Sequence, residues 1–93
     1  MEAKFIALWL ECQKKAALLG VRMRPIAPEK AMESAHRCLS GHRESDGFFP
    51  LADQNRLDLS LEALAVKKEF TSLFSDEEAN NALDRLLSAG YKF

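Results

Sequence analysis

Apolar residues recur near the start of the chain with the spacing of an α-helix. Phe5, Trp9 and Cys12 lie four and three positions apart. Residues at this spacing share one side of a helix with 3.6 residues per turn. Gly20 follows the stretch, and glycine favours the left-handed conformation in which many helices end. The pattern predicts a helix over residues 3–19.

A second helix is predicted over residues 28–41. Proline at its first position has no N–H to leave unpaired there, and glycine at its last position is common just after a helix. The next stretch, residues 42–57, is rich in turn-forming residues, and Pro50 restricts Phe49 to extended or turn geometry. We expect an irregular loop there, with one short helical turn over residues 51–55.

Two more helices are predicted in the C-terminal half. Residues 57–61 alternate like a strand, but apolar residues then continue at helical spacing, which favours a helix from residue 58 or 59 to residue 70. Ser75 and Glu78 match a capping box, in which the two side chains cap each other's backbone N–H groups, and this predicts a helix over residues 75–90. The residues expected on its inner side are Ala79, Ala82, Leu83, Leu86 and Leu87.

Composition agrees with these helices. The 93 residues include 14 Leu and 13 Ala but only five Val, Ile and Thr together. Strands favour β-branched residues, whereas helices favour Ala and Leu. A chain of this length usually forms one domain. We expect a compact all-α fold: a single domain over residues 1–93 with about four main helices and an irregular loop near residues 42–57.

The apolar run at residues 5–10 is stopped by Glu11. It is shorter than the roughly 7–15 apolar residues of a signal peptide and the about 20 residues of a membrane helix. We therefore expect no membrane association and a cytoplasmic location.

Large aromatic residues predict where a partner docks. Phe48 and Phe49 are adjacent in a turn-rich segment, and neighbours in an extended stretch point to opposite sides, so burying both is difficult. The first and third predicted helices are also apolar on more than one side, which is more than a small core covers. We expect a non-enzymatic binding protein that docks on another protein or on its own copy as a homodimer. The expected partner-binding residues are Trp9, Phe48, Phe49, Phe70 and Phe74.

Charge is unevenly distributed along the chain. Residues 1–43 carry eight Lys or Arg against four Glu, a net charge of +4, whereas residues 44–93 carry five against ten Asp or Glu, a net charge of -5. Such asymmetry is typical of a nucleic-acid-binding face or of head-to-tail contact between subunits. Nucleic-acid binding is thus an alternative function, although the cations are not interleaved with aromatic residues for base stacking. The cations that would contact phosphates are Lys14, Lys15, Arg22, Arg24, Lys30, Arg37 and Arg43.

His36, Cys38 and His42 are residue types that bind zinc. On a helix, His36 and Cys38 point roughly 160° apart, so one ion cannot take both, and we predict no metal site. Cys12 and Cys38 are expected to be free thiols. The sequence has no phosphate-binding loop, nucleophile elbow or zinc-protease motif, so we expect neither an enzyme nor a cofactor.

One short resemblance concerns residues 58–62. Ser60, followed by Leu61 and Glu62, is similar to the attachment site of acyl carrier proteins, small four-helix domains in which a serine at the start of a helix holds phosphopantetheine. This chain has Leu59 where that family has aspartate. The resemblance covers three or four residues and implies a remote alternative, a carrier modified on Ser60.

Overall fold

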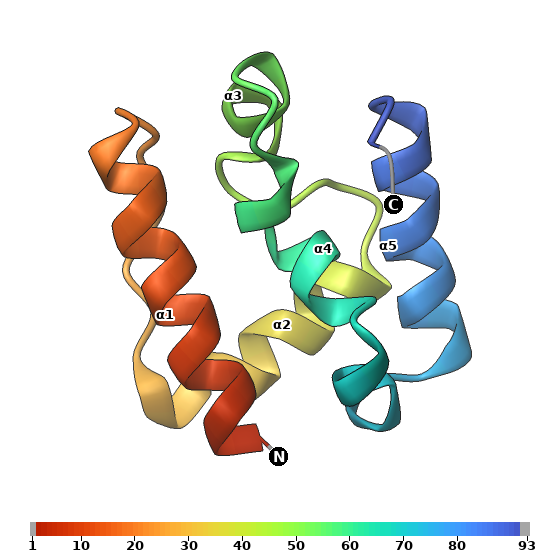
Figure 1. The fold of residues 1–93 in the computed structure, drawn as a ribbon. Coiled ribbons are helices and arrows are strands. Elements are labelled where there is room, and N and C mark those ends of the chain that lie inside the picture. Colours follow the sequence, from red (N-terminus) through yellow and green to blue (C-terminus); the bar gives the residue numbers. More distant parts are fainter. Residues whose placement is uncertain (1, 92–93) are drawn as a thin grey trace.

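The computed structural model describes residues 2–91, which form helices joined by short connections (Figure 1). This part of the chain contains no strand, so the predicted all-α fold is confirmed. The α-helices are α1 (Glu2–Leu18), α2 (Ala31–Ser40), α3 (Phe48–Asp53), α4 (Leu61–Ala65) and α5 (Asp76–Ser88). Three 3₁₀ segments accompany them, η1 (Pro28–Lys30), η2 (Leu57–Leu59) and η3 (Lys68–Leu73).

The long helices α1 and α5 stand on opposite sides of the molecule, with α2 and α4 between them (Figure 1). Helix α4 contacts both α1 and α5, and α2 does the same. The short helix α3 lies at one end, beside the C-terminal ends of α1 and α5 (Figure 1). The two central helices therefore hold the two outer ones together.

Local signals set the ends of α1 and α5 as predicted. After α1, Gly20 has a φ of 82°, and the N–H of Val21 donates to the carbonyl of Ala16 at 3.0 Å. This is the hydrogen bond that a left-handed residue makes possible at a helix end. At the start of α5, Ser75 and Glu78 form the reciprocal capping box. Both helices thus begin or end where nearby residues dictate.

The predicted helix over residues 58–70 is wrong in detail, because the chain forms η2, α4 and η3 there instead. Ser60 is extended, with a ψ of 156°, and its Oγ accepts a hydrogen bond from the N–H of Ala63. It therefore caps a new helix. All five residues of α4 are buried. Four of these five residues are apolar, and a helix without a polar side has no amphipathic pattern, so the sequence did not mark where this helix starts and stops.

The loop predicted near residues 42–57 contains α3, which starts earlier than the predicted turn. Phe49 is helical and not extended, because Pro50 lies in the first turn of α3, where its missing N–H costs nothing. Gly47 precedes α3 with a φ of 78°. A Cβ atom there would lie 2.8 Å from Cγ1 of Val21, so the chain passes close to the segment after α1.

The core has two apolar clusters. In the first, Phe5 is fully buried, and its ring centroid lies 5.2 Å from those of Phe70 and Phe74 and 6.0 Å from that of Trp9. The second cluster joins residues of α1, α3, η2, α4 and α5. Its members are Ala16, Val21, Phe48, Leu51, Leu57, Leu59, Ala63 and Leu86.

Candidate functional site

Four of the five aromatic residues expected to bind a partner belong to the core. Trp9, Phe48, Phe70 and Phe74 each expose 8% or less of their surface. Phe49 alone among the five is exposed, at 61%. Of the two adjacent residues, Phe48 is thus buried and Phe49 is exposed, although both lie on a helix and not on an extended segment. Only Phe49 is available to meet a partner.

Phe49 has two exposed apolar companions, Leu18 at 87% and Leu87 at 59%. Leu18 ends α1, and Leu87 lies in the last turn of α5. The C-terminal ends of α1 and α5 point to the same end of the molecule as α3, which lies between them (Figure 1). We call the three residues the apolar end. Leu87 was expected to face inward, and that expectation is wrong because Leu86 takes the buried position in this turn of α5.

Exposed charges flank the apolar end. Lys14 lies one turn before Leu18 on α1, and Arg22 follows that helix. Asp84 lies three residues before Leu87 on α5. The α1 side of this end is therefore basic and the α5 side is acidic.

The cations proposed to contact phosphates do not form one surface. Three of them pair with carboxylates: Lys15 with Glu11 at 3.6 Å, Arg24 with Asp46 at 3.8 Å, and Arg37 with Glu33 at 3.2 Å. Lys14, Arg22 and Arg43 are exposed on separate segments. The three that do gather, Arg24, Lys30 and Arg37, lie around one pocket.

This pocket, called here the α1–α2 pocket, has a volume of about 460 Å³. Its apolar lining includes Trp9 from α1, Ile26 from the connection between α1 and α2, and Leu61 from α4. One side of α2 and residues 44–46 form the remaining walls. The pocket brings together one predicted aromatic residue and three predicted cations that are far apart in the sequence.

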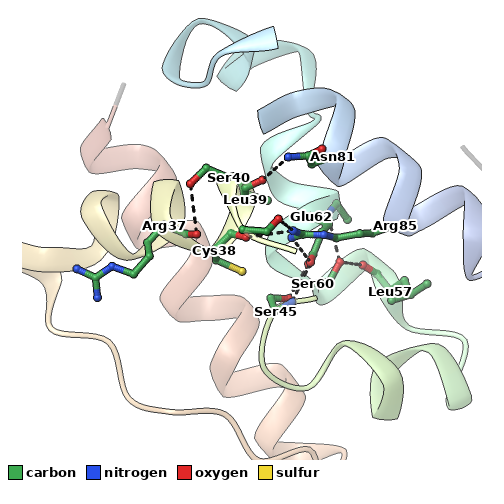
Figure 2. A network of polar contacts seen from close by, with 12 residues as sticks. Arg37, Cys38, Leu39, Ser40, Ser45, Leu57, Ser60, Glu62, Asn81 and Arg85 are labelled. Atoms are coloured by element: carbon green, nitrogen blue, oxygen red, sulfur yellow. Dashed lines mark hydrogen bonds and ion pairs between the residues drawn. The ribbon is translucent and has the colours of Figure 1, made fainter. Parts of the chain in front are cut away.

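A buried ion pair, shown in Figure 2, contacts Ser45 and Cys38, two residues that line the pocket. Nη1 of Arg85 is 3.3 Å from Oε2 of Glu62, and the two side chains expose only 8% and 0% of their surface. Glu62 also accepts hydrogen bonds from the backbone N–H and the hydroxyl of Ser45, at 2.9 and 2.6 Å. The carboxylate therefore fixes Ser45, which lines the pocket.

Arg85 completes this network by donating from Nη2 to the carbonyls of Cys38 and Gly41, at 3.2 and 2.8 Å. These carbonyls lie at the end of α2, where the helix dipole favours a cation. Asn81 donates to the carbonyl of Leu39 in the same region (Figure 2). Together these contacts tie α5 and α4 to the end of α2. No sequence signal linked Glu62 to Arg85, because they are 23 residues apart.

Ser60 does not have the exposure that a carrier serine needs. It is 1% exposed, and its hydroxyl donates to the carbonyl of Leu57 at 2.6 Å while accepting from the N–H of Ala63. Glu62, the acidic residue of the resemblance, is fully buried. Both residues have structural roles here, so the resemblance to acyl carrier proteins does not extend to an accessible attachment site.

His36 contacts a carboxylate and does not belong to a set of metal ligands among the described residues. Its Nδ1 lies 2.7 Å from Oε2 of Glu78, and its ring packs against that of Phe74 at 5.2 Å. No cluster of three metal-binding side chains occurs among residues 2–91. Cys12 and Cys38 are free thiols, as predicted, and partial burial raises the pKa of each above its usual value.

The contact between His36 and Glu78 predicts a loss of stability in acid. Burial opposes ionisation of Glu78, but hydrogen bonding from Ser75 and His36 outweighs it, so its pKa lies below the ordinary value of 4.5. A carboxyl group with a lowered pKa stabilises the fold above its ordinary pKa, and the contribution is lost as the pH falls through the folded value. We expect the free energy of unfolding to fall below about pH 4.5, and less steeply in Glu78→Gln.

Urea denaturation at a series of pH values from neutral to acid measures this effect. Glu77→Gln, an exposed neighbour in the same helical turn, serves as the control and should keep the full acid-dependent loss. Equal slopes in Glu78→Gln and the unmodified chain would contradict the assignment.

Comparisons with known proteins give no relative: no family model, curated protein or solved structure matches this chain. Within the described residues, no helix has the length and apolar character needed to cross a membrane.

Proposed function

We propose that this protein is a non-enzymatic helical binding protein that self-associates through the apolar end formed by Leu18, Phe49 and Leu87. The observation that carries the proposal is the exposure of these three large side chains, at 87%, 61% and 59%, on three helices that reach the same end of the molecule (Figure 1). Large apolar side chains left exposed on one part of a surface are typical of interaction sites. Ala16, Phe48 and Leu86, which lie one or two residues from these side chains in the sequence, belong to the second core cluster, so the same three helix segments are anchored in the core.

Symmetry favours a second copy as the occupant. Most oligomers pair the same surface on both subunits about a two-fold axis. In Figure 1, α3 lies between the ends of α1 and α5. A two-fold axis through α3 places Phe49 against Phe49 of the second copy. It also places the end of α1 in each copy against the end of α5 in the other. The basic residues Lys14 and Arg22 then face Asp84, so the charges of the surface complement themselves.

Nucleic-acid binding has weaker support. Of the seven cations expected to contact phosphates, Lys15, Arg24 and Arg37 each lie beside a carboxylate, which offsets their charge. The others are spread over separate segments, whereas phosphate binding needs cations gathered on one face. The free thiols of Cys12 and Cys38 fit a reducing compartment such as the cytoplasm.

Substitutions at the apolar end test the proposal. Phe49→Ser and Leu18→Gln should each weaken self-association by at least about tenfold, because a central apolar anchor contributes on the order of 1–2 kcal/mol or more. Light scattering coupled to size exclusion measures the mass, at low and at high salt. The dimer should persist at high salt, since apolar contacts are not screened.

Ala7→Gln is the matched control, since Ala7 is an exposed position of α1 far from its C-terminal end. It should leave the mass unchanged. Unaltered self-association in both Phe49→Ser and Leu18→Gln would reject the apolar end as the interface. A dimer lost only at high salt would instead indicate contact between the basic and acidic halves.

A further inference from the structure

We propose that the α1–α2 pocket is a binding site for a small amphipathic anion, specifically an aliphatic carboxylate whose chain enters the pocket while its carboxylate stays at the cationic rim. The proposal rests on the shape and charge of the pocket. It is independent of self-association, because none of Leu18, Phe49 and Leu87 lines the pocket.

The interior of the pocket suits an apolar chain. Its walls carry Trp9, Met23, Ile26 and Leu61, and its volume of about 460 Å³ lies within the range of roughly 300–1,000 Å³ typical of small-molecule sites. Trp9 and Leu61 are 8% and 3% exposed, so only a small part of each faces the pocket, whereas Met23 and Ile26 are half-buried and offer a chain more surface. Burying an aliphatic chain against such side chains is favourable by about 0.8 kcal/mol per methylene.

The rim formed by α2 suits an anion. Lys30 ends η1 directly before α2, Ser34 and Arg37 lie on α2 three residues apart, and all three line the pocket. Lys30 forms no ion pair within the described part of the chain. The pair between Arg37 and Glu33 is highly exposed, at 78% and 67% of the two side chains, and such pairs are weak. Arg37 is therefore free to turn to a ligand, and Figure 2 shows its side chain directed away from the Glu62–Arg85 pair.

Two carboxylates in the lining, Glu44 and Asp46, bear on the orientation of the ligand. Asp46 is engaged by Arg24, both through the guanidinium at 3.8 Å and through the backbone N–H at 3.4 Å. Glu44 has no such partner among residues 2–91. An anion is repelled by Glu44 and attracted by Lys30 and Arg37, so the carboxylate lies on the α2 side. Neutralising Glu44 should tighten binding.

Trp9 provides a direct readout, because it is the single tryptophan of the chain and lines the pocket. We would titrate the protein with decanoate, below the concentration at which micelles form, and follow Trp9 fluorescence. The comparison ligand is decyltrimethylammonium, which has the same chain and the opposite charge. A saturable change with decanoate, and binding of the cation at least about fivefold weaker, are the expected results.

Variants then locate the charge effect. Lys30→Gln and Arg37→Gln should each weaken decanoate binding about three- to tenfold, whereas Glu44→Gln should strengthen it. Lys14→Gln, an exposed cation outside the pocket, is the matched control and should bind decanoate normally. Circular dichroism verifies that every variant is folded.

Three results would overturn the proposal: no saturable change with decanoate, equal binding of decyltrimethylammonium, or normal decanoate binding by both Lys30→Gln and Arg37→Gln. Repeating the titration on Phe49→Ser separates the two proposals. Decanoate should bind that variant with unchanged affinity even though its self-association is weakened.

Discussion

Replacing Glu62 by Leu is expected to lower the free energy of unfolding by about 3–5 kcal/mol, the usual cost of removing one partner of a buried ion pair. Arg85 would remain 8% exposed with its charge uncompensated, and the N–H and hydroxyl of Ser45 would lose their acceptor. Because the same carboxylate ties Ser45 to α4, the segment between α2 and α3 should loosen as well. Urea denaturation monitored by circular dichroism measures the change.

An exposed ion pair on the same molecule is the matched control. Lys4 and Glu69 approach to 2.7 Å, closer than Arg85 and Glu62, but their side chains are 63% and 42% exposed. Glu69→Leu should therefore have no effect comparable to that of Glu62→Leu, since water screens exposed pairs. The double variant Glu62→Leu/Arg85→Leu should be more stable than Glu62→Leu alone, because it leaves no buried charge without a partner. Equal losses in Glu62→Leu and Glu69→Leu would show that burial does not determine the strength of these pairs.

Phe5→Ala should destabilise the fold by about 3–5 kcal/mol, as is typical of a buried phenylalanine. Phe5 is 0% exposed, and three aromatic rings surround it with centroids 5.2 to 6.0 Å away. Its removal leaves a cavity between α1, η3 and the segment before α5, and these three elements cannot move together far enough to fill it. A small domain has only about 5–15 kcal/mol of stability in total, so this loss is a large share of it and the melting temperature of Phe5→Ala should fall by more than about 10 °C.

Phe49→Ala removes the same side chain from an exposed position and provides the control. With 61% of its surface exposed, Phe49 should contribute less than about 0.5 kcal/mol to the stability of the monomer. Thermal denaturation of the two variants at low protein concentration makes the comparison. Similar melting temperatures would mean that the assignment of Phe5 to the core and Phe49 to the surface is wrong.

Much of the fold follows from short-range signals in the sequence. Gly20 and the capping box of Ser75 and Glu78 act within a few residues, so the end of α1 and the start of α5 could be predicted closely. The division of residues 57–73 into three short helices could not. Helix α4 is buried on every side. It starts at Ser60, which accepts a hydrogen bond from the N–H of Ala63, but a serine at this position fits a longer helix equally well, so the sequence does not show that a helix begins here.

The candidate sites depend on contacts between distant residues, so less of them could be predicted. Residue type does not separate Phe48 from Phe49, because which one is buried depends on how α3 packs against the segment after α1. The role of Glu62 depends on Arg85, 23 residues later. The pairing of Arg24 with Asp46 spans 22 residues and changes the apparent charge of the basic half.

The central claim is that the apolar end joins two copies of this chain. Sedimentation equilibrium of the unmodified protein over a wide concentration range, at high salt, tests it most directly. The account predicts that the mass rises with concentration from the 10.5 kDa of one chain towards twice that value. A mass that stays at 10.5 kDa up to the highest concentration would contradict it.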